Sequence, residues 1–313
     1  MTGHGAHQLS ASAAVREGEG RCALVTGLRG FTGDYVAREL EAAGYRVHGT
    51  VMPGGEQGPD IFPIDLCERA AVAAMVEEVQ PDVVVHLAGI ASVAHSNAGQ
   101  IYNVNVVATR NLLEALAGAR RKASCVLLAS SANIYGNASM PVIDESVAPA
   151  PANDYAVSKL AMEYMARLWM DKLPIVLARP FNYTGRGQSE QFLLPKIVGH
   201  FRRGARRIEL GNLAIARDFS DVRTVARSYR RLLAAAPAGE AFNICSGHTH
   251  SLAEVLGMMA EIAGYSIEVE VNPAFVRAND VLTLSGSNAK LLNAIGTVPQ
   301  HPLSATLRWM YSA

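Results

Sequence analysis

The sequence predicts an α/β fold in which a doubly wound parallel sheet carries a smaller, interwoven C-terminal α/β lobe. From residue 21 to about residue 180, short continuous apolar runs alternate with stretches of helical period. This alternation is typical of βαβ units whose strands are covered on both faces. Beyond residue 180 the elements become shorter and mixed. Half of the 313 residues are hydrophobic, enough to bury a large core.

The positions of the individual strands and helices are predicted from the pattern of apolar residues and from the glycine and proline residues that interrupt it. Strands are expected at CALVTG (22–27), YRVHGTV (45–51), DVVVHLAG (82–89), ASCVLLAS (123–130) and PIVLARP (174–180). Helices are expected at 32–44, where Gly44 is a natural stop, and at 68–80, 101–119 and 154–172, the last after a proline-rich loop at 141–153.

A glycine-rich turn joins the first strand to the first helix. In VTGLRGFTG, Gly27, Gly30 and Gly33 permit a tight turn and a close approach of the backbone to a pyrophosphate. The helix that follows offers unpaired N–H groups and the positive end of its dipole. In the first βα turn of such a chain, this motif indicates a Rossmann-type dinucleotide site.

The choice of dinucleotide depends on the end of the second strand, where NAD-binding chains usually place an acidic residue. The stretch GTVMPGG has no carboxylate, and Arg29 in the glycine loop could meet a 2′-phosphate. We therefore expect NADP(H), with NAD(H) as the alternative if Arg29 is merely exposed. Asp65, after a third short strand, could reach the adenine amino group or cap the next helix.

Tyr155 and Lys159 lie four residues apart, and so on one face of the expected helix. An ammonium close to a phenol lowers the phenol pKa and makes it a usable acid and base near neutral pH. Ser130 and Ser131 follow a predicted parallel strand, at the sheet edge where ligands bind. A hydroxyl there could hold the oxygen of a substrate.

The motifs that carry a family resemblance are Gly27/Gly30/Gly33, HLAG (86–89), SSANIYG (130–136), Tyr155/Lys159 and RPFN (179–182). In this order they resemble the extended short-chain dehydrogenase/reductase superfamily, which includes the NAD-dependent epimerase/dehydratase family, over residues 21 to about 310. The resemblance implies that Tyr155 is the acid/base at the sugar oxygen and that Ser131 binds the reacting oxygen. It also implies that Lys159 binds the nicotinamide ribose and lowers the pKa of Tyr155.

The cofactor-binding positions implied by the resemblance are Gly27, Arg29, Gly30, Phe31, Thr32, Gly33, Asp65, Leu66, Leu87, Ala88, Gly89, Tyr155 and Lys159. The expected organisation is a leader at 1–20, a cofactor-binding domain at 21–180 and a lobe at 181–313 that mainly holds substrate.

Segments of the second half, such as RPFNYTGRGQS and NPAFVRANDVLTLSGSNAKL, resemble the nucleotide-sugar branch that handles GDP-mannose derivatives. The substrate-binding positions that this implies are Ser92, Ser131, Asn133, Asn182, Arg217, Arg277 and Asp280. Arginine suits a diphosphate because its fork can pair two oxygens. The alternative interpretation, a surface ion pair, has more support for Arg217, which stands beside Asp218, than for Arg277.

The implied activity is NADPH-dependent reduction of the C4 keto group of a GDP-4-keto-6-deoxyhexose, such as GDP-4-keto-6-deoxy-D-mannose to GDP-D-rhamnose, in deoxysugar and polysaccharide biosynthesis. Asn133 stands where the dehydratases of the family carry a glutamate, so water elimination is disfavoured. The reductases often keep that glutamate too, so Asn133 departs from both. A 4-epimerase with tightly bound NAD and a cofactor-sensing protein without chemistry remain alternatives.

Other features favour a protein without nucleic acid, membrane or metal partners. The formal net charge is zero, and we interpret the basic run FRRGARR (201–207) as a solvated helix end. The four cysteines are scattered, His86 is expected in the core, and His248 and His250 in a solvent-facing loop. The sequence has no apolar run long enough for a membrane span and no signal-peptide pattern, which indicates a cytoplasmic protein. The family suggests a homodimer through helices near 101–117 and 155–172.

Overall fold

The computed structural model describes residues 16–91, 97–136, 138, 140–213, 215–273 and 283–313. Its largest element is a parallel sheet of seven strands in the order β10-β6-β5-β4-β1-β2-β3. The strands are β1 (Cys22–Thr26), β2 (Arg46–Val51), β3 (Ile61–Pro63), β4 (Val83–His86), β5 (Cys125–Ala129), β6 (Ile175–Pro180) and β10 (Ala241–Ile244). The strand order reverses between β1 and β4, so the predicted doubly wound sheet is confirmed.

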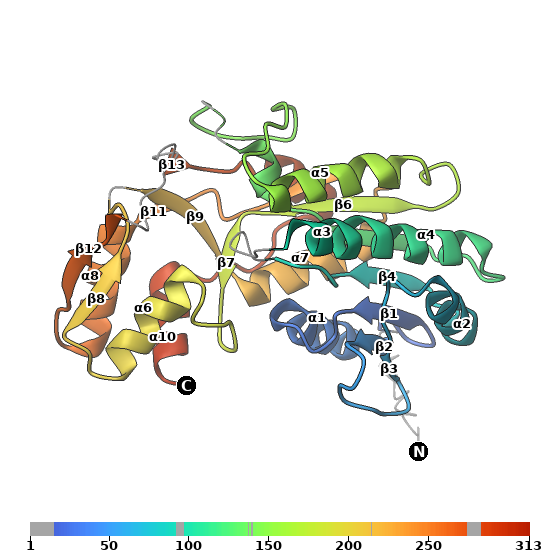
Figure 1. The fold of residues 1–313 in the computed structure, drawn as a ribbon, viewed down its shortest axis with the longest axis horizontal. Helices are drawn as coiled ribbons and strands as arrows, with labels where there is room; N and C mark the ends of the chain where they lie inside the picture. Colours follow the sequence, from blue (N-terminus) through green and yellow to red (C-terminus); the bar gives the residue numbers. More distant parts are fainter. Residues whose placement is uncertain (1–15, 92–96, 137, 139, 214, 274–282) are drawn as a thin grey trace, which may run out of the picture.

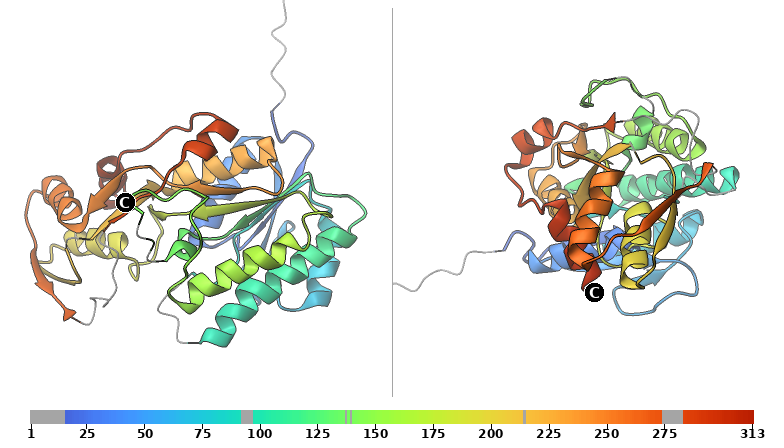
Figure 2. Two further views of the ribbon diagram at one scale, coloured as in Figure 1. Left: turned by 90° about the horizontal axis from the view of Figure 1, so that it is seen from above. Right: turned by 90° about the vertical axis from the view of Figure 1, so that its left-hand side faces the viewer.

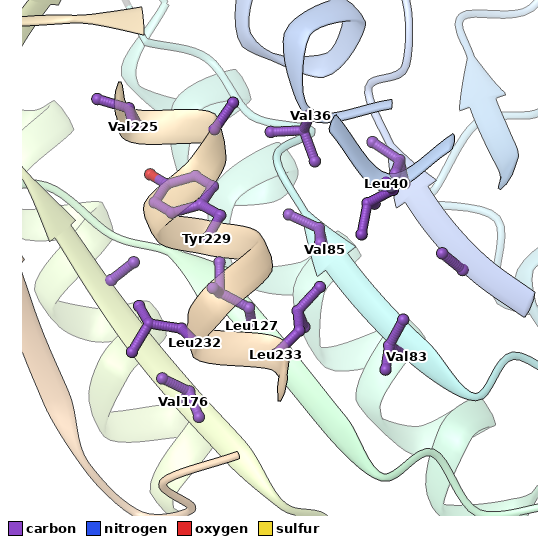
Figure 3. Close-up of a cluster of buried hydrophobic side chains, with 14 of the residues drawn as sticks. Val36, Leu40, Val83, Val85, Leu127, Val176, Val225, Tyr229, Leu232 and Leu233 are labelled. Carbon is purple, nitrogen blue, oxygen red and sulfur yellow. The ribbon is translucent and has the colours of Figure 1, made fainter. Parts of the chain in front are cut away.

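Helices cover both faces of this sheet (Figure 1). Helices α1 (Phe31–Ala42) and α7 (Val222–Ala235) pack on one face, with α9 (Ala289–Ile295) beside α7. Figure 3 shows this core layer, in which Tyr229 and Leu232 of α7 lie over Leu127 and Val176. Helices α2 (Arg69–Val79), α4 (Ala108–Gly118) and α5 (Asp154–Arg167) cover the other face. Strands buried on both faces explain the continuous apolar runs of the sequence.

Two expected helices differ in detail. The helix expected at 101–119 begins earlier, as α3 (Ala98–Tyr102), and passes through a π-helical turn, η1 (Asn103–Val107), before α4. This stretch was expected to be one continuous helix, so the π-turn, which is a single-residue insertion, was not predicted. Helix α5 ends at Arg167 instead of residue 172, because the chain must turn back there to enter β6 at Ile175.

The rest of the chain builds a second lobe, seen at the left of Figure 1 and in both views of Figure 2. Its strands are β7 (Asn182–Thr184), β9 (Ala216–Asp221), β11 (Thr249–Ser251) and β13 (Thr283–Leu284), with β8 (Arg207–Leu210) pairing β12 (Glu268–Val271). Its core joins α6 (Leu193–Arg202), α8 (Leu252–Ala263) and α10 (Leu303–Tyr311). Between β9 and β11 the chain returns to the large sheet to form β10.

Candidate active site

The predicted cofactor and catalytic residues meet at the carboxyl edge of the large sheet. The glycine loop follows β1, residues 87–89 follow β4, and Ser131 follows β5 at the start of a short 3₁₀ turn, η2 (Ala132–Tyr135). All seven strands are parallel, so these loops open at the same edge. In open α/β sheets this edge, at the reversal of strand order, is where ligands bind.

The glycine loop is packed too tightly for side chains. A Cβ on Gly33 would lie 2.3 Å from the Gly27 carbonyl oxygen, and Gly27 itself has φ of +72°. Gly30 is the N-cap residue of α1 and offers no side-chain cap, so the first N–H groups of that helix face the loop. A Cβ-free cradle before open N–H groups fits the pyrophosphate of a dinucleotide.

Arg29 of the glycine loop forms an ion pair that sequence reasoning missed. Its Nε and Nη2 donate to the two carboxylate oxygens of Glu56, with Nη2 2.9 Å from Oε1. Both side chains are about half exposed. Glu56 stands one residue beyond the GTVMPGG stretch, so a carboxylate does follow β2. The expected preference for NADP(H) therefore depends on whether Arg29 pairs with Glu56 or with the 2′-phosphate of the cofactor.

Asp65 lies after β3, as expected, but does not cap the following helix. The N-cap of α2 is Glu68, and Asp65 Oδ1 instead accepts a hydrogen bond from the Cys67 amide at 2.8 Å. The carbonyls of Leu66 and Cys67 accept from Asn111 Nδ2 at 3.1 and 3.0 Å. The loop predicted to hold adenine is thus fixed by α4.

His86 is a buried structural residue, which confirms the expectation. Its Nδ1 lies 2.7 Å from Thr26 Oγ1 and its Nε2 lies 2.8 Å from Thr109 Oγ1. Thr26 Oγ1 also accepts from the amides of Leu87 and Ala88 at 3.1 and 3.2 Å. Burial, together with a smaller contribution from the charge of Lys159, lowers the pKa of His86 to about 3. The network therefore holds the predicted cofactor-lining loop.

Ser131 is buried, and its hydroxyl interacts with both Asn133 and Tyr155. It accepts from the Asn133 backbone amide at 3.1 Å and from Asn133 Nδ2 at 3.0 Å. The Tyr155 phenol interacts with the same hydroxyl. Asn133 is otherwise exposed, so its amide stands at the open side of the serine.

Tyr155 occupies the first turn of α5, whose N-cap Asn153 accepts from the Ala156 amide at 2.9 Å. Burial raises the pKa of Tyr155 to about 12, while its interaction with the Ser131 hydroxyl opposes the rise. A phenol with this pKa is protonated at neutral pH and can act as a proton donor.

Lys159 is buried one turn later on α5. Its Nζ donates to the Ala129 carbonyl of β5 at 2.7 Å. Burial lowers its pKa to about 8, although the charge of Glu163 opposes this. Since its hydrogen bond goes to the backbone of β5, the lowering of the Tyr155 pKa by Lys159 stays a prediction.

Asn105, in the π-turn η1, is a site residue that the sequence analysis missed. Its amide bridges Ile90 and the helix of the tyrosine: Oδ1 accepts from the Ile90 amide at 2.8 Å, and Nδ2 donates to Ser158 Oγ at 2.9 Å. A Cβ on Gly89 would lie 2.9 Å from Asn105 Oδ1 and 3.4 Å from Lys159 Nζ. The asparagine therefore joins the β4 loop to α5. A π-turn beside a functional site is a recurring association.

A buried ion pair lies between α5 and the 3₁₀ turn η2. Arg179 Nε and Nη2 donate to both oxygens of Glu163, at 2.9 and 2.6 Å. Arg179 Nη1 also donates to the Tyr135 hydroxyl at 2.9 Å, which in turn donates to Asn243 Oδ1 at 2.8 Å. The network ties α5 to the 3₁₀ turn that carries Ser131, and to β6 and β10.

Of the predicted substrate residues, the structure describes four. Asn182 is exposed at the start of β7, and Arg217 lies half-buried on β9, with Nη1 donating to the Ala216 carbonyl at 2.9 Å. Ser131 and Asn133 lie together at the end of β5. Ser92, Arg277 and Asp280 lie outside the described residues.

Of the other polar residues that the sequence analysis considered, two arginines form surface ion pairs and one histidine is exposed. Arg203, at the C-terminal end of α6, pairs with Glu190 at 2.7 Å, and Arg207 pairs with Glu268 and Glu270 on β12. His248 is exposed. Within the described ranges, no three metal-ligating side chains gather into a cluster, and no helix has the length and apolar character needed to cross a membrane.

Comparison with known proteins decides the family. The model of the NAD-dependent epimerase/dehydratase family matches residues 23–245. The chain belongs to this family. The predicted superfamily is therefore confirmed, and the protein is an NAD(P)-dependent oxidoreductase of the extended short-chain class.

Relatives of this epimerase/dehydratase family member span nearly its whole length. It is 34% identical to GDP-6-deoxy-D-talose 4-dehydrogenase of Aggregatibacter actinomycetemcomitans, over 87% of this chain and 90% of that protein. It is 33% identical to GDP-6-deoxy-D-mannose reductase of Pseudomonas aeruginosa, over 92% and 95%.

Solved structures of similar proteins have the same fold. The structure of RMD from Pseudomonas aeruginosa complexed with NADPH has a TM-score of 0.81 at 32% identity, covering 93% of this chain and 98% of that one. A structure from Burkholderia cenocepacia, described as a candidate epimerase, has a TM-score of 0.90 at 57% identity, covering 94% and 98%.

Proposed function

We propose that the protein reduces the C4 keto group of a GDP-4-keto-6-deoxyhexose with NADPH, converting GDP-4-keto-6-deoxy-D-mannose to GDP-D-rhamnose. The observation that carries the proposal is the arrangement at Ser131, whose hydroxyl meets a protonated, buried Tyr155 and the Asn133 amide. A proton donor and an oxygen-binding hydroxyl are what reduction of a ketone requires from the protein. Two relatives named for GDP-6-deoxyhexoses support the substrate class.

NADPH, when bound, supplies the hydride. Tyr155 donates its phenolic proton to the oxygen of the former ketone, because its raised pKa keeps that proton in place until the oxygen becomes strongly basic. Ser131 holds the same oxygen through its hydroxyl and so stabilises the developing negative charge. Lys159, which is fixed by the Ala129 carbonyl, would bind the nicotinamide ribose and would lower the pKa of Tyr155 through its positive charge.

Asn133 argues against elimination of water from the sugar. Removal of the C5 proton and loss of the C6 hydroxyl need a second acid/base beside Ser131, and a side-chain amide does not exchange protons near neutral pH. The position is exposed toward the open side of the site, where the substrate would lie. Reduction needs no such group.

Substrate and cofactor contacts complete the proposal. Asn182 and Arg217 lie on the lobe that faces the sheet edge, and we assign them to the sugar diphosphate, together with Arg277; Asp280 would bind the nucleoside ribose and Ser92 the sugar. The glycine loop holds the cofactor pyrophosphate, with Arg29 available for a 2′-phosphate. The NADPH complex of the Pseudomonas aeruginosa relative supports NADPH as the cofactor.

A second candidate is a nucleotide-sugar 4-epimerase, favoured by the similarity to a candidate epimerase at 57% identity. An epimerase would hold NAD tightly and return the hydride to the opposite face of the same sugar. Purified protein that carries a stoichiometric nicotinamide cofactor would point to this activity.

The test is loss of NADPH absorbance with freshly prepared GDP-4-keto-6-deoxymannose, with NMR of the product. The wild type should consume NADPH, Tyr155→Phe should lose at least about a hundredfold in kcat, and the C4 coupling pattern should be that of the rhamno sugar. A talo product would correct the stereochemistry and keep the reaction. No NADPH consumption, with interconversion of a GDP-, UDP- or dTDP-hexose, would establish the epimerase instead.

We also propose that the protein is a homodimer through α5 and the α3–η1–α4 segment. Val157 and Tyr164 of α5 and Leu168, its C-cap residue, follow one stripe and are 38%, 56% and 75% exposed, and Val107 of η1 is 43% exposed. Apolar side chains in such a stripe favour burial against a second copy. Light scattering should give a dimer for the wild type and a monomer for Leu168→Asp; a monomeric wild type would contradict the proposal.

A further inference from the structure

The hydroxyl of Ser131 receives two hydrogen bonds from a single residue. A serine hydroxyl has two lone pairs, which accept, and one proton, which it donates. The backbone amide of Asn133 donates to Ser131 Oγ at 3.1 Å, and Asn133 Nδ2 donates to the same oxygen at 3.0 Å. Both lone pairs are therefore occupied, and the hydroxyl can form a further hydrogen bond only as a donor.

The local fold explains how both donors reach the serine. Ser131 is the N-cap residue of η2, and its side chain caps this turn by accepting from the Asn133 amide. Such a cap by itself leaves one lone pair of the hydroxyl free. The Asn133 side chain fills that lone pair from the exposed side of the turn, while Ser131 itself is only 4% exposed.

The direction of this hydroxyl matters for the proposed reduction. The ketone oxygen gains negative charge as it receives the hydride, and donors stabilise that charge. A serine with a free lone pair could accept the proton of Tyr155, which interacts with the same hydroxyl. With both lone pairs occupied, Ser131 cannot hold the proton of Tyr155, and its own proton is directed away from Asn133.

We propose that Asn133 is a positioning residue that fixes Ser131 as a hydrogen-bond donor, so that the protons of Ser131 and Tyr155 both stay available to the ketone oxygen. Asn133 acts through the serine and needs no contact with the sugar. The inference rests on the proposed function and deepens it. It gives a task in the reduction to the residue that stands in place of the dehydratase glutamate, since a carboxylate there could only accept.

Asn133→Asp tests the polarity of this contact. The substitution keeps the shape of the side chain and replaces its N–H donor by a carboxylate, which would take the Ser131 proton. In the NADPH assay with GDP-4-keto-6-deoxymannose at about pH 7.5, kcat should fall at least about a hundredfold, the scale of one lost oxyanion donor. The KM for the sugar nucleotide should stay the same, because the contact with the serine is not a contact with substrate.

The pH profile separates this effect from a structural one. A protonated carboxyl has an O–H donor, so the deficit in kcat should shrink severalfold from about pH 7.5 to about pH 5, toward a carboxyl pKa of about 4. Tyr155 and Lys159 are the same in both proteins, so the ratio of the two kcat values reports the new carboxyl. A folding defect would instead enlarge the deficit on acidification.

Two further variants complete the comparison. Asn133→Ala removes the side-chain donor and leaves the backbone amide, so kcat should fall only about tenfold, and equally at both pH values. Asn293→Asp is the matched control, because it adds the same charge at an exposed position of α9, one turn or less from Ile295, which accepts from Arg231 of α7. Its kcat should equal that of the wild type at both pH values.

A raised KM with unchanged kcat in Asn133→Asp would overturn the inference, because Asn133 would then contact the sugar directly. A wild-type kcat, or a deficit that does not shrink on acidification, would also overturn it. If the wild type interconverted a nucleotide-linked hexose instead, the same variants would be compared in that reaction, where Ser131 would meet the sugar oxygen as well. If it catalysed neither reaction, the proposed function would fail, and this inference with it.

Discussion

Acidification from about pH 7.5 to about pH 5 should destabilise the protein through His86. The hydrogen bonds around this residue select the neutral imidazole. Thr109 Oγ1 donates to the Asn105 carbonyl at 2.8 Å, so it accepts from His86 Nε2. Thr26 Oγ1 already accepts two backbone amides, so its own proton is directed to His86 Nδ1. A second ring proton would have no acceptor at Nδ1.

The magnitude follows from the two pKa values. The folded-state pKa of His86 is about 3, against a usual value of 6.5. The unfolded chain therefore takes up a proton below pH 6.5 that the folded chain refuses, and stability falls as the pH falls toward 3. Integrating the difference gives a loss of about 2 kcal/mol in the free energy of unfolding at pH 5.

Urea unfolding at a series of pH values would measure this loss in the wild type and in His86→Gln. The variant keeps a polar side chain toward Thr109 but cannot titrate, so its curve should lack about 2 kcal/mol of the wild-type decline between pH 7.5 and pH 5. Only the slopes are compared, because the substitution also changes stability at neutral pH. Parallel curves for the two proteins would refute the assignment of the buried neutral histidine.

Three further substitutions test the site. Glu56→Gln should free Arg29 and strengthen NADPH binding by roughly two- to fivefold, with little effect on NADH, in fluorescence titrations. Gly33→Ala should weaken NADPH binding by at least about tenfold in the same titration, because its Cβ would lie 2.3 Å from a carbonyl of the glycine loop. Tyr135→Phe should cost about 1.5–3 kcal/mol in the free energy of unfolding, measured in urea, because buried Arg179 loses an acceptor.

Each of these expectations has a result that would contradict it. Equal NADPH affinity in Glu56→Gln would mean that Arg29 does not meet the 2′-phosphate. Gly257→Ala on α8 is the control for Gly33→Ala, since a Cβ there meets nothing within 4 Å, and it should stabilise the protein by up to about 1 kcal/mol. Wild-type stability in Tyr135→Phe would show that water replaces the lost acceptor.

The parts of the fold and site that the sequence predicted are those with local signals. Apolar runs identified the strands, and the motifs that follow two of them placed Gly27 and Ser131 at one edge of the sheet. Such residues are predictable because the carboxyl ends of parallel strands always share an edge. The π-turn at 103–107 was missed because the stretch was treated as one regular helix, and the phase of its apolar residues was not compared before and after this point.

Residues that reach the site from elsewhere in the chain had no comparable signal. Glu56 meets Arg29 only because the loop after β2 folds back toward the glycine loop. Asn105 and Tyr229 lie inside helices whose apolar periodicity is explained by packing against the sheet. Only the structure shows that Asn105 has a hydrogen-bond partner in the β4 loop and that the Tyr229 hydroxyl has none. A buried polar group within an apolar helix face is a weak signal that could have marked both.

The position of β10 has a consequence for how the chain folds during synthesis. The edge strand β10 pairs with β6, yet some 60 residues, most of them in the second lobe, lie between these two strands in the sequence. While only the first half of the chain has been synthesised, β6 forms an unpaired edge of the sheet. Such edges invite association with other chains. We therefore expect the two lobes to unfold in one transition, and a chain truncated before residue 241 to aggregate.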